Sequence, residues 1–215
     1  QGGAGFITPI NNYLRKIKEK CEKVNALLIL DEIQTGIGRT GKLFAFEHYN
    51  AIPDILVYGK GLGGGFPIGA LSSSKEKMGL FKKNPILGHI TTFGGHPVCC
   101  AGSLATLQTL LSEKEIIHSV KQKELLFRKQ LQHPSIQEVR GVGLMLAIEL
   151  GDAERCREFV ALAHQKGLMT FFFLCTSTAI RLSPPLIISE EEIIESCEKM
   201  KEILDEIIYS KVGQR

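Results

Sequence analysis

The stretch Ile52-Pro53-Asp54-Ile55-Leu56-Val57-Tyr58-Gly59-Lys60-Gly61-Leu62-Gly63-Gly64-Gly65 runs from an apolar segment into a lysine flanked by glycines. An earlier apolar run, residues 26–30, leads in the same way to Asp31 and Glu32. We expect both runs to be strands of one sheet, with an acid and an amine at matching ends. In open α/β sheets, ligands bind at that edge. The glycines beside Lys60 would let another group approach the backbone closely.

An acid and an amine at one sheet edge suit pyridoxal phosphate. A lysine amine forms a Schiff base with the aldehyde of this cofactor, and a carboxylate pairs with its protonated pyridine nitrogen, so that the ring can accept electrons. At an effective dielectric of about 20, a carboxylate about 4 Å from the ring N–H⁺ gains on the order of 4 kcal/mol. That gain is enough to keep the ring protonated at neutral pH.

Bulk composition is typical of a soluble globular protein. The chain has 215 residues, of which 44% are hydrophobic and 23% charged, enough for one large domain or two small ones. The net charge of +3 is spread among interspersed lysines and glutamates, so we expect neither nucleic acid nor an anionic membrane as partner. No apolar run approaches the roughly 20 residues that a membrane helix needs.

The six cysteines form no CxxC pair, and the adjacent Cys99 and Cys100 lie in a stretch of small residues where free thiols pack as apolar groups. A reducing, cytoplasmic compartment is therefore expected. His89 and His96 bracket a pair of threonines, but neither carboxylates nor paired cysteines stand at ligand spacing, so we expect no metal site.

Composition changes at His133-Pro134-Ser135, where we place a domain boundary. Before it, helical and strand-like segments alternate, including a long amphipathic helix predicted over residues 113–132. After it, residues 139–150 and 169–175 are strand-like, and residues 153–166 are helical. The sequence Ser189-Glu190-Glu191-Glu192 is a capping box that begins a final helix. We therefore expect an α+β domain over residues 134–215.

The segment from Gly36 to Lys42 matches two nucleotide-binding patterns, GxGxxG and GxxxxGK. Both matches are incomplete. Leu43 stands where a P-loop carries Ser or Thr for Mg²⁺, and the dinucleotide pattern would have to follow its strand directly, whereas residues 31–35 intervene. A P-loop-like nucleotide-binding ATPase module is the alternative interpretation.

A family resemblance rests on several segments together. Residues 28–42, Leu-Ile-Leu-Asp-Glu-Ile-Gln-Thr-Gly-Ile-Gly-Arg-Thr-Gly-Lys, followed by the Lys60 segment, resemble the signature of class III, or ω-type, aminotransferases. Residues 91–97, 140–145 and 180–186 resemble later segments of the same family. The resemblance runs along the whole chain but covers only about the C-terminal half of such an enzyme, since Gln1-Gly2-Gly3-Ala4-Gly5 resembles the tail of the family's Glu-Pro-Ile-Gln-Gly-Glu segment.

The resemblance implies an α/β fold of the type I pyridoxal-phosphate enzymes. Residues 1–133 would be the C-terminal part of the large cofactor-binding domain with its mostly parallel sheet, and residues 134–215 the smaller α+β domain. The expected reaction moves an amino group from a donor such as ornithine, N-acetylornithine or 4-aminobutyrate to a 2-oxo acid, 2-oxoglutarate above all. A truncated, non-catalytic fragment of this fold is a further alternative. Ornithine-type relatives carry Glu where Gly3 stands, and His96 replaces the usual Asn.

The resemblance also assigns roles to single residues. Lys60 would hold the internal aldimine and then shuttle a proton as general base and acid. Asp31 would pair with the pyridine nitrogen, Ile33 would pack on the ring and Gln34 would bind the ring hydroxyl. Two further residues would complete the site: Thr92, reaching the phosphate of the neighbouring subunit's cofactor in a homodimer, and Arg181, binding the substrate carboxylate as a bidentate fork. Taken alone, Asp31-Glu32 would be interpreted as a solvated strand terminus and Lys60 as a surface lysine.

Overall fold

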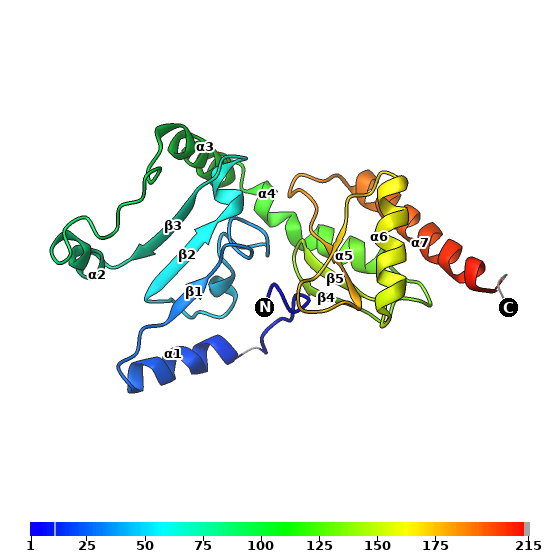
Figure 1. Cartoon of the computed structure of the whole chain (residues 1–215), viewed down its shortest axis with the longest axis horizontal. Coiled ribbons are helices and arrows are strands. Elements are labelled where there is room, and N and C mark those ends of the chain that lie inside the picture. The colour runs from blue at the N-terminus through cyan, green and yellow to red at the C-terminus, as the bar shows by residue number, and fades with distance from the viewer. Residues whose placement is uncertain (11, 213–215) are drawn as a thin grey trace. The chain divides into compact units, whose positions relative to one another are not determined.

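The computed structural model describes residues 1–10 and 12–212 and divides the chain into two compact units (Figure 1). The first unit runs from Pro9 to Ile117. The second unit joins Gln1–Thr8 to His118–Arg215. Among the described residues, no helix combines the length and the apolar character needed to cross a membrane.

The first unit holds a three-stranded sheet in the order β1-β2-β3 (Figure 1). Its elements, in chain order, are α1 (Tyr13–Lys23), β1 (Ile29–Asp31), η1 (Ala45–His48), β2 (Ile55–Gly59), η2 (Lys60–Gly63), β3 (Gly69–Ser73), α2 (Lys75–Gly79), η3 (Leu80–Lys82) and α3 (Pro97–Ser112). Strands β1 and β2 are parallel, and β3 returns antiparallel to β2. The expected mostly parallel sheet is thus represented by one parallel and one antiparallel pairing.

Asp54 ties the helices of the first unit to the start of its sheet. The carboxylate accepts a hydrogen bond from the backbone N–H of Leu28 at 2.9 Å and pairs with Lys18 Nζ on α1 at 2.9 Å. Lys77 on α2 adds a longer ion pair of 3.7 Å. The Leu28 N–H, followed by the Lys18 ammonium, lowers the pKa of Asp54 from its ordinary value. The acid that precedes β2 is therefore structural.

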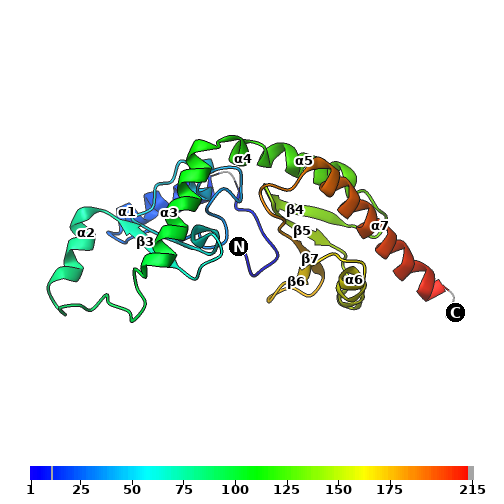
Figure 2. The same cartoon turned by 90° about the horizontal axis from the view of Figure 1, so that it is seen from above.

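The second unit is a four-stranded antiparallel sheet covered by helices (Figure 2). Its strands are β4 (Glu138–Val142), β5 (Met145–Glu149), β6 (Phe171–Phe172) and β7 (Ala179–Leu182), in the order β4-β5-β7-β6. Its helices are α5 (Val120–Gln130), α6 (Ala153–Gln165) and α7 (Glu190–Val212), and α4 (Glu115–His118) lies at the division between the units. The predicted α+β character of the C-terminal part is confirmed.

The two units divide the chain before His118, ahead of the boundary predicted at residues 133–134. Side-chain burial explains the difference, because Phe127 of α5 and Ile203 of α7 are fully buried in one core. The first eight residues also belong to the second unit. The change in composition at residues 133–135 does not indicate which helices pack into which core.

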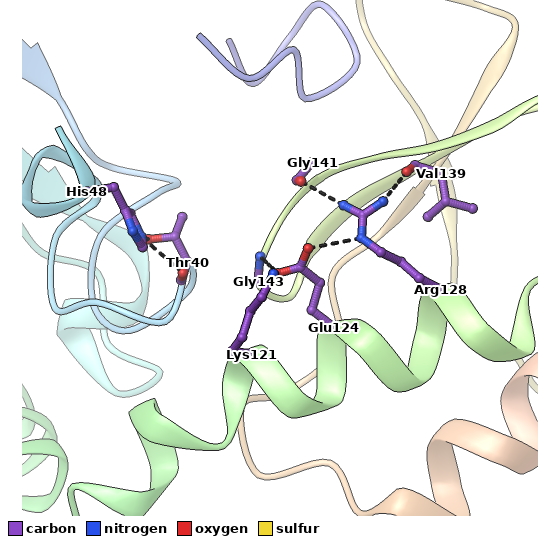
Figure 3. A network of polar contacts seen from close by, with 8 residues as sticks. All are labelled: Thr40, His48, Lys121, Glu124, Arg128, Val139, Gly141 and Gly143. Atoms are coloured by element: carbon purple, nitrogen blue, oxygen red, sulfur yellow. Dashed lines mark hydrogen bonds and ion pairs between the residues drawn. The ribbon is translucent and has the colours of Figure 1, made fainter. Parts of the chain in front are cut away.

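A buried carboxylate joins α5 to the β4–β5 hairpin (Figure 3). Glu124, whose side chain is 5% exposed, accepts hydrogen bonds from Gly143 N at 2.9 Å and Arg128 Nε at 2.9 Å. The Arg128 guanidinium in turn donates to the carbonyl oxygens of Val139 and Gly141. The hairpin backbone and the helix are therefore held by one charge-assisted network, a strong class of hydrogen bond.

Thiol reactivity tests the core of the second unit. Burial raises the pKa of Cys156 to about 11 and that of Cys197 to about 12, while Cys175 is exposed. Because the thiolate is the reactive form, we expect iodoacetamide at about pH 8 to label Cys175 in the folded protein and the two buried thiols only after unfolding in urea. Peptide mass spectrometry measures the labelling. Equal labelling of Cys197 and Cys175 in the folded protein would contradict the described core.

Candidate active site

The parallel register of β1 and β2 places an acid and an amine at one edge of the first unit's sheet. Asp31, the last residue of β1, pairs in register with Val57. Strand β2 ends two residues later at Gly59, and Lys60 follows at once as the first residue of η2. Both residues lie at the carboxyl ends of adjacent parallel strands, as predicted from the two apolar runs. Both are exposed.

The Asp31 carboxylate is oriented by the chain that follows it. Its Oδ1 accepts a hydrogen bond from the backbone N–H of Ile33 at 2.9 Å. A carboxylate has about four acceptor positions, so this contact fixes its direction without using up its capacity. Asp31 can therefore accept a hydrogen bond from a ligand while the turn keeps its side chain in place.

Glu32 occupies a different environment from its neighbour. Its side chain is 3% exposed, and its carboxylate accepts hydrogen bonds from Thr35 Oγ1 at 2.9 Å, Ala45 N at 2.6 Å and Phe46 N at 2.7 Å. Glu32 therefore fastens both ends of the loop over residues 32–46. The interpretation of Asp31-Glu32 as a solvated terminus holds for Asp31 alone. Glu32 follows the last residue of β1, and its N–H still donates to Val57 O at 2.7 Å, so the extended chain points the side chains of Asp31 and Glu32 to opposite sides.

Backbone geometry directs Lys60 away from the line of β2. Lys60 has φ +47°, a left-handed conformation that is uncommon outside glycine. A Cβ atom at the preceding Gly59 would stand 3.1 Å from Ile68 O and 3.9 Å from Ile33 Cγ1. The side chain of Ile33 is thus close to the end of β2. Asp31, Ile33 and Lys60 are brought together around the two strand ends.

The glycines after Lys60 serve helix α3. Gly64 has φ +58°, and a Cβ there would stand 2.4 Å from Thr106 Oγ1. A Cβ at Gly102, on α3, would stand 2.9 Å from Gly63 O. Glycine is needed on both sides of this contact, because any side chain would separate the helix from the turn. The glycines after Lys60 were expected to let another group approach the backbone closely. At Gly63 and Gly64 that group is helix α3.

The loop that matches the nucleotide patterns is closed by its own hydrogen bonds. The amides of Gly38, Arg39 and Gly41 donate to carbonyl oxygens within the segment 36–43. His48 Nε2 lies 3.1 Å from both the carbonyl and the hydroxyl oxygen of Thr40 (Figure 3). A phosphate cradle needs amides that point at a ligand and a helix that follows directly. The turn before η1 offers neither arrangement, and the ATPase interpretation is wrong for this loop.

The remaining predicted site residues lie on three different segments. Gln34 is half-buried in the turn after β1, next to Ile33. Thr92 is exposed in the segment between η3 and α3. Arg181 is half-buried on β7 of the second unit, where its Nε donates to Ser183 Oγ at 3.3 Å. The strand-end cluster therefore includes Asp31, Ile33 and Lys60, with Gln34 beside it in the chain.

Comparisons with known proteins agree on one family. Residues 1–204 match the family model described as aminotransferase class-III. Acetylornithine aminotransferase of Caldanaerobacter subterraneus subsp. tengcongensis is 40% identical over 214 residues, which cover 97% of this chain and 52% of the relative. Ornithine aminotransferase 2 of Staphylococcus aureus strain N315 is 42% identical over 211 residues, which cover 94% of this chain and 50% of the relative. The chain spans about half the length of the curated relatives it matches.

Solved structures give the same result. The acetylornithine aminotransferase of Elizabethkingia anophelis superposes with a TM-score of 0.87 at 35% identity, covering 96% of this chain and 52% of that one. The ornithine aminotransferase of Plasmodium yoelii superposes with a TM-score of 0.84, also at 35% identity, and the match covers 95% of this chain and 55% of that one. The expected fold class, that of the type I aminotransferases, is confirmed by these neighbours.

Replacing Glu32 tests the structural support of the site. In Glu32→Gln one carboxylate oxygen becomes an NH₂ group that faces a backbone N–H, so a buried donor loses its partner. We expect a loss of about 1–3 kcal/mol in the free energy of unfolding of the first unit. Hydrogen exchange should speed up at Ala45 and Phe46.

The matched control for this change is Glu47→Gln. Glu47 Oε1 accepts one hydrogen bond, from Phe44 N at 2.7 Å in an exposed position, which an amide oxygen can also accept. The control should leave exchange at the loop unchanged. Equal stability and equal exchange in both variants would show that Glu32 does not fasten the loop.

Proposed function

Because the chain belongs to the class-III aminotransferase family, we propose that it forms the lysine-bearing part of an aminotransferase dependent on pyridoxal phosphate. The reaction would move an amino group from an amino-acid or ω-amine donor to a 2-oxo acid, with 2-oxoglutarate as the expected acceptor. Relatives named acetylornithine, putrescine and ornithine aminotransferase support this class of donor. The observation that carries the proposal is the register of β1 and β2, which brings Asp31 and Lys60 to one sheet edge.

The groups at the strand ends fit pyridoxal phosphate in kind. They comprise a carboxylate for a pyridine N–H⁺, a primary amine for an aldehyde, the apolar side chain of Ile33 for a ring face and the amide of Gln34 for a ring hydroxyl. When bound, the cofactor supplies an aldehyde that condenses with amines and a ring that accepts electrons. The loop after β1 does not offer a nucleotide site, because the amides of Gly38, Arg39 and Gly41 already donate to carbonyl oxygens of the loop itself.

Lys60 would act in two ways. Its Nζ would hold the cofactor covalently at rest. Once a donor amine had displaced it, the free amine would take a proton from the donor carbon as a general base and release it again as a general acid. The left-handed backbone at Lys60 supports this role, because it turns the side chain out of the strand at the edge where Asp31 lies.

Asp31 would hold a proton on the ring nitrogen. An opposite charge within hydrogen-bond distance favours the protonated form of such a nitrogen. The Ile33 N–H keeps Oδ1 in a fixed direction, so the carboxylate need not reorganise when the ring binds. Ile33 would thus contribute twice, through its backbone to Asp31 and through its side chain to the ring face.

Thr92 would bind the phosphate of a neighbouring subunit's cofactor, which implies a homodimer. Its surroundings support an interface. Ile86, Leu87, Ile90 and Phe93, in the same segment, are between 57% and 80% exposed. Apolar side chains gathered on one exposed segment mark protein–protein contact sites.

A cytoplasmic location is part of the same proposal. All six cysteines are free thiols, which fits a reducing compartment. Two of them, Cys156 and Cys197, are fully buried without a bridging partner. They act as apolar core residues of the second unit.

The assignment of Lys60 predicts a single covalent attachment site. We expect borohydride reduction of the longest natural polypeptide that contains this chain, loaded with pyridoxal phosphate, to label the peptide bearing Lys60. Lys60→Ala should lose the label and turnover, whereas Lys42→Ala, which removes an exposed lysine of the neighbouring loop, should keep both. Label at Lys42 or at any other lysine in the wild-type protein would refute the assignment.

Arg181 should distinguish donors by their carboxylate. Replacing it with Lys removes the bidentate fork, and a contact to a charged group of this kind is worth about 1.5–3 kcal/mol, or roughly 10- to 100-fold. We expect kcat/KM to fall by that factor for amino-acid donors and to change little for a plain alkylamine. The two donors are compared in the first half-reaction, without an acceptor. Equal losses would show that Arg181 has only a structural role.

A further inference from the structure

The two faces of the second unit's sheet are covered differently. Side chains alternate along β7, so Ile180 and Leu182 enter the core shared with the helices, while Ala179 lies in a separate cluster on the other face. By the same alternation Arg181 lies on the face of Ala179. Its register neighbour on β5, Ala147, belongs to that cluster too. Arg181 therefore projects from a small apolar patch on the face away from the helices.

Phe6 completes this patch from a distant part of the chain. It is 3% exposed and packs with Met145, Ala147, Phe173 and Ala179. The rings of Phe6 and Phe173 meet edge to face, with centroids 4.7 Å apart and planes at 87°. That arrangement is one that aromatic pairs prefer, and it fixes the plane of the Phe6 ring.

The segment that carries Phe6 is fastened to the sheet by its backbone. Arg140 Nε donates to Gly5 O at 2.7 Å, and Arg140 is itself paired with Glu149 at 2.8 Å. Cys175 N donates to Gly3 O at 3.1 Å. Phe6 has φ +54°, a conformation that a bulky residue adopts only where its surroundings impose it. The fold thus holds Phe6 in an unfavourable backbone conformation to place its ring on this patch.

The ring lies against the Arg181 guanidinium. The guanidinium carbon is 5.1 Å from the centroid of the Phe6 ring, within the roughly 6 Å that cation–π contacts span. Ser183 Oγ, 3.3 Å from Arg181 Nε, restrains the same group from a second side. A guanidinium stacked on an aromatic face is held in one plane, and within that plane its N–H groups can form a bidentate contact with a carboxylate.

We propose that Phe6 is a positioning residue that holds the Arg181 guanidinium ready for a substrate carboxylate, and so sets the preference for amino acids and 2-oxo acids over plain amines. This rests on the proposed function of Arg181 as the carboxylate-binding group. Phe6 acts through Arg181, because its own side chain is buried. The affinity for a carboxylate increases because the motion of the guanidinium is already restricted before the substrate binds.

The kinetic test uses two substitutions in the longest natural polypeptide that contains this chain, loaded with pyridoxal phosphate. Phe6→Leu removes the aromatic ring but keeps an apolar side chain, and Phe6→Tyr keeps the ring. We expect Phe6→Leu to raise the apparent dissociation constant for an amino-acid donor about three- to tenfold in the first half-reaction. The maximal rate should be unchanged, as should the constants for an alkylamine. Phe6→Tyr should behave as the wild type.

A spectroscopic readout is independent of activity. Protons over the face of an aromatic ring resonate upfield, so the Arg181 Nε–H signal, assigned by its loss in Arg181→Lys, should be shifted upfield in the wild type and in Phe6→Tyr. The shift should disappear in Phe6→Leu. Titration with succinate, a dicarboxylate without an amine, should move this signal and require about three to ten times more ligand in Phe6→Leu.

The outcomes separate this inference from the proposed function. If Arg181→Lys is selective for carboxylate donors but Phe6→Leu affects amino-acid and alkylamine donors equally, or affects neither, Phe6 is only a packing residue and the inference is overturned. If Arg181→Lys is itself unselective, the carboxylate role of Arg181 is wrong, and the inference falls with it. If Phe6→Leu weakens the binding of amino-acid donors but not of alkylamines, and Phe6→Tyr binds both as the wild type does, the result supports both the inference and the proposed role of Arg181.

Discussion

The parallel pairing of β1 with β2 is the constraint on which the rest of the first unit depends. Side chains alternate along a strand, so a slip of one residue in this register would turn Asp31 to the other face. Asp31 stands opposite Val57, and the chain turns into η2 at Lys60, three residues after Val57. Main-chain hydrogen bonds thus bring Asp31 and Lys60 to the same edge of the sheet. The side chains themselves remain exposed and available.

Carboxylates with several hydrogen-bond partners hold the scaffold of each unit together. Glu32 fastens the loop after β1, and Asp54 joins the starts of β1 and β2 to α1. In the second unit, Glu124 does the same for the β4–β5 hairpin. Each of these carboxylates accepts several hydrogen bonds, which offsets the cost of desolvating the two that are buried, Glu32 and Glu124. Asp31 differs from these three carboxylates, because it is exposed at the end of β1 while they hold parts of the scaffold together.

Local signals predicted a large part of this structure. The two apolar runs are β1 and β2, and the capping box is confirmed, with Glu192 Oε2 2.8 Å from Ser189 N and Ser189 Oγ 3.2 Å from Glu192 N. Other features depend on contacts between distant residues. The predicted helix over residues 113–132 is divided into α4 and α5, and Phe6 joins a sheet whose strands begin more than a hundred residues later in the chain. No local pattern marks such packing, so neither the division between units nor the contact with Arg181 could be predicted.

A crystal structure of the longest natural polypeptide that contains this chain, grown with pyridoxal phosphate, would test the roles of Asp31 and Lys60. We expect continuous electron density from Lys60 Nζ to the cofactor and an Asp31 carboxylate oxygen about 2.6–3.2 Å from the ring nitrogen. Cofactor density joined to a different lysine, or a ring nitrogen that faces away from Asp31, would contradict these roles.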